Sequence, residues 1–488
     1  MNRSLSEVPV VEAAAAPSEQ WRDLRYRPFL VLVAVGIVLR TGLMFAYFPA
    51  VLIHADSARF ARIGWSMYGD FWMPAGYPMF LWLLRQVSRQ LWVTIWIQHL
   101  LGLGTGTFLY LSMRRLGVIR GIACVPAAIP LLSGDHLYLE HTVMADFLII
   151  FLAAGGIWAA IWGLVPKLNL HWVAIASALL AMAALTRSVG VVLLPIFVLC
   201  TVLWVKESFR TRCSAAAAAV LPGMAVFAFY VVGFYFNHGQ YLGLTDMSGW
   251  NLYARVAPFA DCRKFVPPEG TAILCEERSP ANRPAPFGYV WDLESVPRKH
   301  FELGPKTGRQ LGEFARRAIV HQPEEYAGAV LTDLVKFLDS SSVPSRAWDG
   351  TPPEMLSFGW RNATGEENIV QVMSHSYRGT HVRRRWQSLL AFYQNLSRPS
   401  GGLSLAVILV LTCIGLVKAS GAIRLGIALF GLSAFGLYLV PALSLAYSFR
   451  YGIPPETFII ASGVLGAVSI WPRLTMDEEI KKSRQTIA

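Results

Sequence analysis

Long apolar runs alternate with short polar segments along most of this chain. About ten such runs can be recognised, and we interpret each as a membrane-spanning helix, because about 20 helical residues cross the hydrocarbon core of a bilayer. The expected spans are 29–48, 91–111, 122–132, 147–164, 172–185, a sixth run that ends at VKESFRTRCS (205–214), 215–236, 402–417, 423–445 and 454–471. The pattern predicts an all-α polytopic membrane protein.

Basic residues gather in every second connection between these runs. Examples are RDLRYR (22–27), MRRLGVIRG (113–121) and KASGAIR (418–424). Short loops rich in Lys and Arg remain on the cytoplasmic side of a membrane, so this alternation orients the chain with both termini inside. Hydropathy and charge are independent signals, and here they give the same topology.

The topology divides the chain into five expected parts. They are a cytoplasmic leader (1–28), a transmembrane core (29–236) whose first outer loop is 49–90, an extracytoplasmic cap (237–398), C-terminal transmembrane helices (399–472) and a cytoplasmic tail (473–488). Within the cap, apolar residues at helical spacing over 311–339 predict two helices with a break at Pro323. We expect a mixed, mainly helical cap.

Composition narrows the class further. The chain has 488 residues, 54% of them hydrophobic, which excludes an ordinary soluble enzyme and a disordered chain. The net charge of +12 comes from basic residues that are spread among the loops, so nucleic acid is not an expected partner. One basic stretch, RGTHVRRRW (378–386), lies just before the eighth run, and we interpret it as a juxtamembrane anchor to anionic lipid.

Two of the six cysteines, Cys262 and Cys275, lie in the polar outer segment. Their spacing suits a local disulfide if this segment faces an oxidising compartment. Two unpaired thiols are the alternative.

The segment VLIHADSARFARIGWSM (51–67) follows the first span and mixes charged with large apolar residues. This composition favours an amphipathic helix at the membrane surface. Asp56 then has two compatible interpretations: it caps a helix over 57–68, or it is a general base that removes a proton from a hydroxyl nucleophile. His54 and Arg59, which flank it, are candidate substrate-binding residues.

A second candidate cluster is YLEHTVMADFL (138–148), which contains Glu140, His141 and Asp146. An acid inside an apolar run is costly and usually marks function, although Asp146 can equally be the partner of an arginine on a neighbouring span. Together with Asp56, these side chains are candidate ligands for a divalent metal such as Mg, Mn or Ca. The signal for a metal site is weak, because the acids are scattered and only one histidine accompanies them.

Arg187 and Arg450 both lie between apolar runs on the predicted outer side. Each can extend toward lipid headgroups. Alternatively, the planar guanidinium binds phosphate well, and two arginines on one face suggest an anionic lipid headgroup as ligand.

The order of these motifs resembles the GT-C glycosyltransferases. The acid after the first span is followed by AGYPMFLWLL (75–84), EHTVMADFL (140–148), LTRSVGVVLLP (185–195) and FRYGIPP (449–455). The pattern is most similar to the branch with protein O-mannosyltransferases and the lipid A aminoarabinose transferase. The resemblance covers about 29–236 and 400–471.

The resemblance implies a hexosyl- or pentosyltransferase of the bacterial plasma membrane. It would move one sugar, with inversion, from a polyprenyl-phosphate donor to a hydroxyl of an envelope glycan, glycolipid or protein at the extracytoplasmic face. Asp56 is then the base, and Arg187 and Arg450 stabilise the leaving phosphate. Asp146, with Glu140 or His141, orients the sugar or acceptor. Aromatic residues such as Tyr77 stack on sugar faces or anchor at the interface.

Two other functions fit parts of the pattern. A transporter or flippase of a lipid-linked or anionic solute would explain the many spans and intramembrane charges, but it explains the long outer segment poorly. A transferase with a lipid-pyrophosphate oligosaccharide donor is a nearer alternative.

Overall fold

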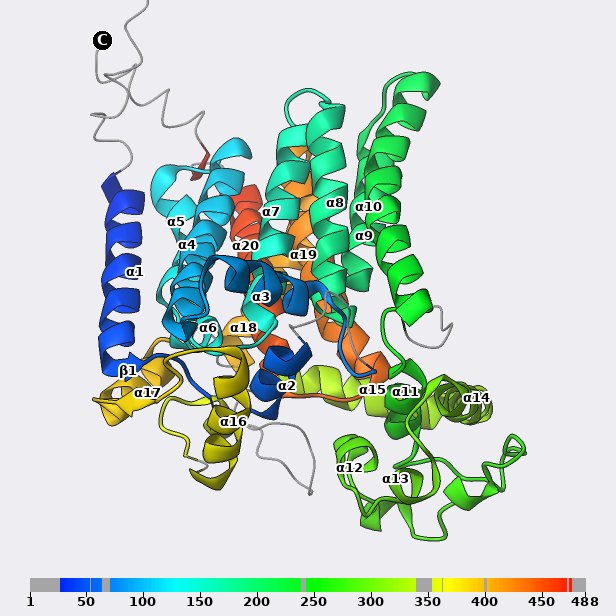
Figure 1. Cartoon of the computed structure of the whole chain (residues 1–488). Coiled ribbons are helices and arrows are strands. Elements are labelled where there is room, and N and C mark those ends of the chain that lie inside the picture. The colour runs from blue at the N-terminus through cyan, green and yellow to red at the C-terminus, as the bar shows by residue number, and fades with distance from the viewer. Residues whose placement is uncertain are drawn as a thin grey trace, which may run out of the picture.

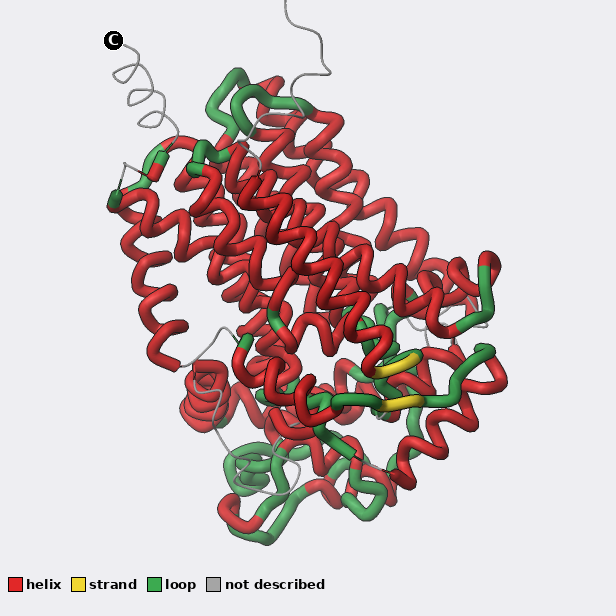
Figure 2. Tube along the Cα trace, turned by 90° about the vertical axis from the view of Figure 1, so that its left-hand side faces the viewer, coloured by secondary structure: helices red, strands yellow, loops and turns green. Residues whose placement is uncertain are grey.

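The computed structural model describes residues 27–52, 54–63, 71–237, 243–338, 353–361, 363–398, 402–471 and 474–475. The chain forms a bundle of long helices with a layer of shorter helices and loops at one end (Figure 1). The bundle helices run side by side, and strands are confined to one short pair (Figure 2).

The bundle occupies the positions that the hydropathy pattern predicts. Its helices are α1 (Arg27–Ala46), α4 (Leu91–Arg115), α5 (Arg120–Leu132), α6 (Gly134–Glu140), α7 (Asp146–Leu164), α8 (Leu170–Thr186), α9 (Leu193–Trp204), α10 (Phe209–Asn237), α18 (Gly402–Lys418), α19 (Gly421–Ser444) and α20 (Phe449–Ile470). Each of the ten predicted runs falls largely on one of them. The predicted all-α fold is therefore confirmed.

Among the described residues, five helices are long and apolar enough to cross a membrane: those at 28–46, 146–164, 209–236, 421–444 and 449–470. The pair α5–α6, bent by 49°, makes a sixth if it counts as one span. Three further apolar helices, at 170–186, 188–204 and 404–418, are shorter. These are the helices of a multi-pass membrane protein.

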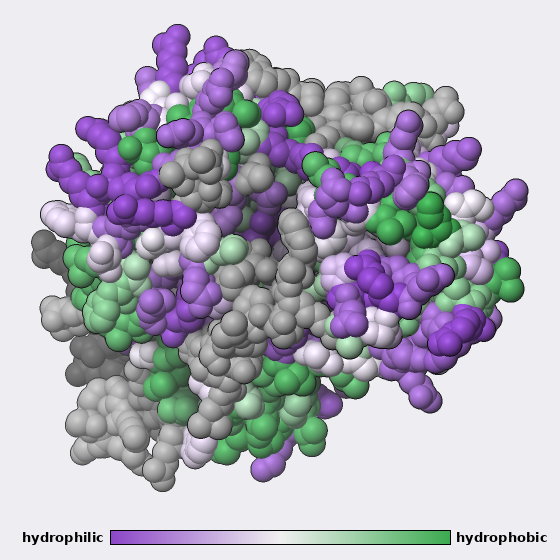
Figure 3. Space-filling model, turned by 90° about the horizontal axis from the view of Figure 1, so that it is seen from below, coloured by the Kyte–Doolittle hydropathy of each residue, from purple (hydrophilic) through white to green (hydrophobic). Residues whose placement is uncertain are grey.

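The outer layer contains the first outer loop and the cap. The loop carries α2 (Ala55–Ile63) and α3 (Gly76–Val87). The cap carries α11 (Ser248–Val256), α12 (Pro286–Trp291), α13 (Val296–His300), α14 (Pro305–His321), α15 (Pro323–Leu338), α16 (Ala363–Ser376), α17 (Gln387–Leu396) and the short 3-10 helices η4 (Ala272–Leu274), η5 (Pro280–Asn282) and η6 (Pro353–Leu356). Seen from this side, much of the described surface is hydrophilic and it is hollowed near its centre (Figure 3).

The predicted break at Pro323 is present, because α14 ends at His321 and α15 begins at Pro323. Helix α14 packs on α11 around the buried side chains of Trp250, Tyr253 and Phe314. Leu445 and Ala446, just before α20, also belong to this second hydrophobic core, and Phe71 and Trp72 of the first outer loop pack against it, so it joins the cap to its neighbours.

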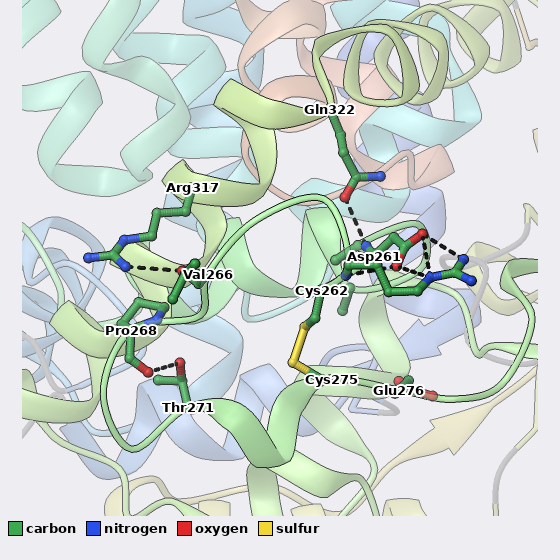
Figure 4. The surroundings of a disulfide bond; sticks show 12 residues. Asp261, Cys262, Val266, Pro268, Thr271, Cys275, Glu276, Arg317 and Gln322 are labelled. Atoms are coloured by element: carbon green, nitrogen blue, oxygen red, sulfur yellow. Dashed lines mark hydrogen bonds and ion pairs between the residues drawn. A yellow bond between two sulfur atoms is a disulfide. The ribbon is translucent and has the colours of Figure 1, made fainter.

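The predicted disulfide between Cys262 and Cys275 is present in the cap (Figure 4). It closes a loop beside the turn between α14 and α15. The backbone N–H of Asp261 donates to the side-chain oxygen of Gln322 in that turn at 2.8 Å. The disulfide therefore fixes an irregular segment that has few regular backbone hydrogen bonds of its own.

Three short backbone pairings hold the outer layer to the bundle, one of them between Gln90, just before α4, and Arg378 of the cap. Strand β1 (Tyr47–Phe48), directly after α1, pairs antiparallel with β2 (Arg383–Arg384) of the cap. A little farther on, Val51 pairs in parallel with Thr142, which follows α6. These contacts fix where the first outer loop begins, and thus where its acidic residue lies.

Candidate active site

Four charged side chains from distant parts of the chain form one line of ion pairs. Nη1 of Arg450 donates to Oδ2 of Asp56 at 2.6 Å. On its other side, Nε of Arg450 lies 3.1 Å from both carboxylate oxygens of Asp146. Asp146 also accepts from Nη1 of Arg187. Acid and base thus alternate in the order Asp56, Arg450, Asp146 and Arg187, and the formal charges cancel.

Local backbone structure brings the two carboxylates together. The N–H of Val51 donates to the carbonyl of His141 at 2.9 Å, which places the start of α2 beside the start of α7. Asp56 lies in the first turn of α2, and Asp146 is the first residue of α7. Both acids are therefore close to the positive end of a helix dipole, which favours their charged forms.

Helix α2 begins at Ala55, two residues before the predicted start, so Asp56 is inside the first turn and does not precede the helix as a cap would. Its side chain contacts Arg450. The predicted end of this helix, at 68, lies outside the described residues.

Arg187 follows the last residue of α8 and precedes the 3-10 helix η3 (Ser188–Val192). A positive charge is favoured there, at the negative end of the α8 dipole. The motif AGYPMFLWLL contributes Gly76, where an added Cβ would lie 2.5 Å from the carbonyl oxygen of Leu185. Only glycine lets α3 approach this end of α8 so closely. The side chain of Arg187 is 15% exposed and points to Asp146.

Arg450 lies in the first turn of α20, where the helix dipole alone disfavours a positive charge. The two carboxylates compensate for this position. The turn before it is held by the cap, since Asp333 of α15 accepts the backbone N–H of Tyr447 at 3.0 Å. Asp333 also accepts from Arg255 of α11 at 2.5 Å. The cap thus fixes the segment that carries Arg450.

The two carboxylates differ in accessibility. The side chain of Asp56 is 27% exposed, whereas that of Asp146 is fully buried. Asp56 is therefore the carboxylate that a substrate hydroxyl can reach. Asp146 neutralises and orients two arginines from inside the protein, as the ion-pair interpretation of this residue predicts.

The arginines control the ionisation of Asp56. Burial by itself would raise the pKa of this carboxyl group, but the hydrogen bond and charge of Arg450, with the charge of Arg187, outweigh burial and lower the pKa below its ordinary value. Asp56 is consequently an ionised proton acceptor at neutral pH.

His54 lies next to this line of charges. Its Nε2 is 2.8 Å from the hydroxyl of Tyr138. Burial, and then the nearby charge of Arg450, lower the pKa of His54 to about 4. The imidazole is therefore neutral at pH 7 and adds no charge to the site.

Arg59 and Tyr77, the other candidates near Asp56, contact protein groups. The guanidinium of Arg59 stacks over Trp72, 4.8 Å from the ring centre, and Trp72 in turn stacks on Trp291 of the cap at 4.8 Å. The hydroxyl of Tyr77 donates to Gln98 at 2.7 Å, and its ring is fully buried. Arg59 thus joins elements of the outer layer, and Tyr77 joins the outer layer to the bundle.

Glu140 and His141 belong to a different, fully buried network. Both carboxylate oxygens of Glu140 accept from Arg40, at 2.6 and 2.9 Å, and one of them also lies 2.8 Å from His99. His141 lies 3.1 Å from His99. An added Cβ at Gly102 would lie 1.8 Å from Glu140, so this glycine makes room for the carboxylate. The polar atoms of this network satisfy one another inside α1, α4 and α6.

This separation corrects the expectation that Asp56, Glu140, His141 and Asp146 form one metal site. Within the described ranges, no group of three or more His, Cys, Asp or Glu side chains could hold a metal ion. The cation between Asp56 and Asp146 is the guanidinium of Arg450. Within the described residues, the side chains around Asp56 do not make a ligand set for Mg, Mn or Ca.

A small pocket borders the line of charges on the side of Arg187. Apart from Arg187 and Tyr451 it is lined by apolar residues: Ile149, Val189, Leu437, Pro441, Pro454 and Pro455. The guanidinium of Arg187 lies 5.1 Å from the centre of the Tyr451 ring. The pocket is small, with apolar walls and the guanidinium of Arg187 at one end.

Sequence reasoning did not identify Arg40, Tyr138, Asp333 or Tyr451. Arg40 is an arginine inside the first apolar run, and intramembrane charge is the signal that could have singled it out. Tyr138 and Tyr451 lie inside the motifs YLEHTVMADFL and FRYGIPP but carry no charge that singles them out, and Asp333 is one of several acids in the cap.

No known family model matches the chain, and no curated protein is similar to it in sequence. The chain is distantly similar in structure to several solved proteins. One is the Archaeoglobus fulgidus oligosaccharyltransferase in the apo form, with 10% identity and a TM-score of 0.47 over 95% of this chain. Another is ArnT from Cupriavidus metallidurans bound to undecaprenyl phosphate, with 14% identity and a TM-score of 0.35 over 91% of this chain.

The match covers 52% of the oligosaccharyltransferase and 78% of ArnT, so this chain spans about half the length of the former. Another structure of the archaeal enzyme is a complex with an inhibitory peptide and a dolichol-phosphate, at 11% identity and a TM-score of 0.44. These similarities are distant. The function is therefore inferred from the residues of this chain.

Proposed function

We propose that this chain is an integral-membrane glycosyltransferase of GT-C type. It transfers one sugar, with inversion, from a polyprenyl-phosphate donor to a hydroxyl group of a cell-envelope acceptor. The observation that carries the proposal is the line Asp56, Arg450, Asp146 and Arg187, which joins a reachable carboxylate to two arginines beside an apolar pocket. The motif order of the sequence supports the same function.

Asp56 is assigned the role of general base. It is the accessible carboxylate of the line, and it is ionised at neutral pH. In the reaction the acceptor hydroxyl gives its proton to Asp56, and its oxygen forms a bond to the anomeric carbon. The bond from that carbon to the phosphate oxygen breaks, and its electron pair leaves with the polyprenyl phosphate.

Arg187 and Arg450 are assigned to the phosphate. Charge on the leaving oxygen grows as the bond breaks, and preformed guanidinium groups stabilise that charge without reorganisation. The apolar pocket beside Arg187 would take the start of the hydrocarbon chain. Asp146 holds both guanidinium groups in place before the anion arrives.

The charge balance connects the two substrates. Arg450 contacts both acids, so an incoming phosphate competes with them for its guanidinium. A phosphate that draws Arg450 away from Asp56 removes the charge that lowers the pKa of Asp56, and the carboxylate becomes a stronger base. Donor binding would thereby prepare the base.

The location follows from the topology. We place the active site at the extracytoplasmic face of a bacterial plasma membrane, with both termini in the cytoplasm. The cap over this face carries the disulfide, which is consistent with an oxidising compartment.

The test is sugar transfer by the purified protein in lipid vesicles, with a panel of polyprenyl-phosphate sugars and a mixed envelope acceptor. We expect transfer from one donor, and a loss of about 10²- to 10⁴-fold in Asp56→Asn. Asp292→Asn, which changes a cap carboxylate, is the matched control and should retain full activity.

Other outcomes would redirect the assignment. Transfer only from lipid-pyrophosphate oligosaccharides would replace the monophosphate donor. Movement of a lipid or solute across the membrane, with no transfer and no effect of Asp56→Asn, would identify a transporter and overturn the proposal.

A further inference from the structure

Helix α17 presents a row of large apolar side chains to the outside of the protein. Leu389, Phe392 and Leu396 follow one another at helical spacing and are 61, 64 and 72% exposed. Trp386, just before the helix, is 67% exposed. A contiguous exposed apolar stripe on a helix normally marks a surface that contacts something else.

The opposite side of α17 is firmly attached to the bundle, so the stripe cannot turn inward. The hydroxyl of Tyr393 donates to the carbonyl of Leu132 at the end of α5. The amide of Gln394 donates to Asp135 of α6 at 2.8 Å. Ser397 accepts the backbone N–H of Gly134 at 2.8 Å.

The position of α17 along the membrane normal is fixed at both ends. Before it, β2 pairs with β1, which continues directly from the membrane helix α1. After it, α18 begins at Gly402, six residues beyond the end of α17. In the structure α17 lies beside the outer end of α1 (Figure 1). The helix is therefore at the level where two membrane helices leave the hydrocarbon.

Basic side chains flank the stripe. Arg383 and Arg385 form no ion pair with any residue in the described part of the chain, and both are exposed. The guanidinium of Arg383 lies 5.1 Å from the centre of the Phe48 ring, at the end of β1. A helix with an apolar face, next to exposed arginines at this depth, matches the chemistry of an anionic lipid surface.

We propose that α17 lies in the plane of the outer leaflet, with Leu389, Phe392 and Leu396 among the upper acyl chains and Arg383 and Arg385 on lipid phosphates. The occupant of this surface is the bilayer itself. The proposal is independent of the transferase function. It makes α17 an anchor that holds the cap at a set depth, because its inner face is bonded to α5 and α6.

The test places a fluorescent label on the stripe. Cys124, Cys200, Cys213 and Cys413 are replaced by Ala, the disulfide is kept, and Phe392→Cys is labelled with bimane in the full-length protein. The protein is reconstituted in vesicles with acyl chains brominated near the headgroup. Leu293→Cys is the matched control, since Leu293 is 66% exposed between α12 and α13, which lie farther from the bundle (Figure 1).

We expect the brominated lipid to quench the label at 392 at least about threefold more than the label at 293. The label at 392 would lie a few ångströms inside the bilayer, whereas the label at 293 would lie outside it. Equal quenching at both positions would overturn the proposal. So would a label at 392 that is shielded from lipid and cross-links to a second copy or to another protein.

The arginines are tested in the same assay. Quenching at 392 should be stronger in vesicles with phosphatidylglycerol than in phosphatidylcholine alone, and the paired substitution Arg383→Gln and Arg385→Gln should remove this difference. Quenching that does not depend on lipid charge, in either protein, would overturn the role assigned to the two arginines.

Discussion

Arg450 is the residue on which the candidate site depends most. It contacts the accessible Asp56 and the buried Asp146 at once, so one guanidinium sets the charge state of the first and neutralises the second. A lone exposed arginine would be worth little, but a guanidinium that is 16% exposed and shared between two acids is held in a single geometry. Changes to this residue should therefore be visible in the titration of Asp56.

The pH dependence of transfer follows from these pKa values. Asp56 works in its ionised form, and its pKa is lowered, so its activity is lost only as the pH falls below the ordinary aspartate range. His54, with a pKa of about 4, does not titrate near neutrality either. We expect kcat/KM, which reports the free protein, to show no acid limb from these groups between about pH 8 and pH 5. An acid limb centred near pH 6 that disappears in Asp56→Asn would contradict this.

Removing Arg450 should move the titration of Asp56 upward. In Arg450→Gln, burial still raises the pKa of Asp56, but the main opposing charge is gone. The carboxyl band of Asp56, identified in infrared difference spectra against Asp56→Asn, should then titrate at higher pH than in the native protein. Arg263→Gln, which makes the same charge change at a cap side chain that is 90% exposed, should leave this band in place.

Glu140 should matter for stability more than for transfer. Glu140→Gln leaves the guanidinium of Arg40 buried without its counter-charge, which costs about 3–5 kcal/mol. We expect a clear fall in the thermal unfolding temperature of the detergent-solubilised protein, whereas Asp56→Asn, in a more accessible pair, should unfold near the native temperature. Unchanged unfolding together with lost transfer would return Glu140 to the substrate site.

At the scale of elements, the cap helices act on the site through the turn before α20. Helix α15 reaches this turn through Asp333, which accepts both the Tyr447 backbone N–H and the side chain of Arg255. The cap is thus attached to the segment that carries Arg450, although no cap residue belongs to the line of charges. A second attachment, β1 with β2, fixes the outer end of α1.

Asp333→Ala should weaken transfer without removing the catalytic groups. The turn at 445–448 loses its only described side-chain acceptor on Tyr447 N–H, so Arg450 is held less tightly, and a displacement of about 1 Å can lower a rate about 100-fold. We expect turnover to fall by about tenfold or more. Glu313→Ala, which removes an exposed cap carboxylate paired with Arg316, is the control. Equal activity of the two variants would argue against this coupling.

At the scale of the whole molecule, charge and architecture agree. The connections between α4 and α5, α7 and α8, α9 and α10, and α18 and α19 lie at the end of the bundle away from the cap (Figure 1). These are the connections where the basic residues gather. The predicted orientation puts that end in the cytoplasm and the cap outside.

Native cysteines can test this orientation. Cys213 is exposed near the start of α10, at the end away from the cap, and the disulfide lies within the cap. In intact cells, a membrane-impermeant maleimide should label Cys262 and Cys275 after mild reduction but should not label Cys213. Labelling of Cys213 in intact cells, and of the cap cysteines only after permeabilisation, would reverse the topology.

Much of this architecture could be predicted from the sequence, because hydropathy and charge act residue by residue. The transfer free energy of an apolar run and the position of basic loops require no knowledge of distant contacts, so the helices and their expected orientation follow from composition along the chain. The break at Pro323 and the local pair Cys262 and Cys275 are equally short-range features. Asp56, Asp146, Arg187 and Arg450 were also recognisable, as charges next to apolar runs.

Tertiary structure alone decided which of these charges meet. Asp56 and Arg450 are 394 positions apart, and their contact depends on how α2 and α20 are placed by the rest of the bundle. The same packing directs Glu140 to Arg40 and Tyr77 to Gln98, away from the acids that stand near them in the sequence. The type of a residue and the helix in which it lies follow from the local sequence. Its partner is decided by the packing of helices that are far apart in the chain, since a buried charge must find its counter-charge wherever the fold provides one.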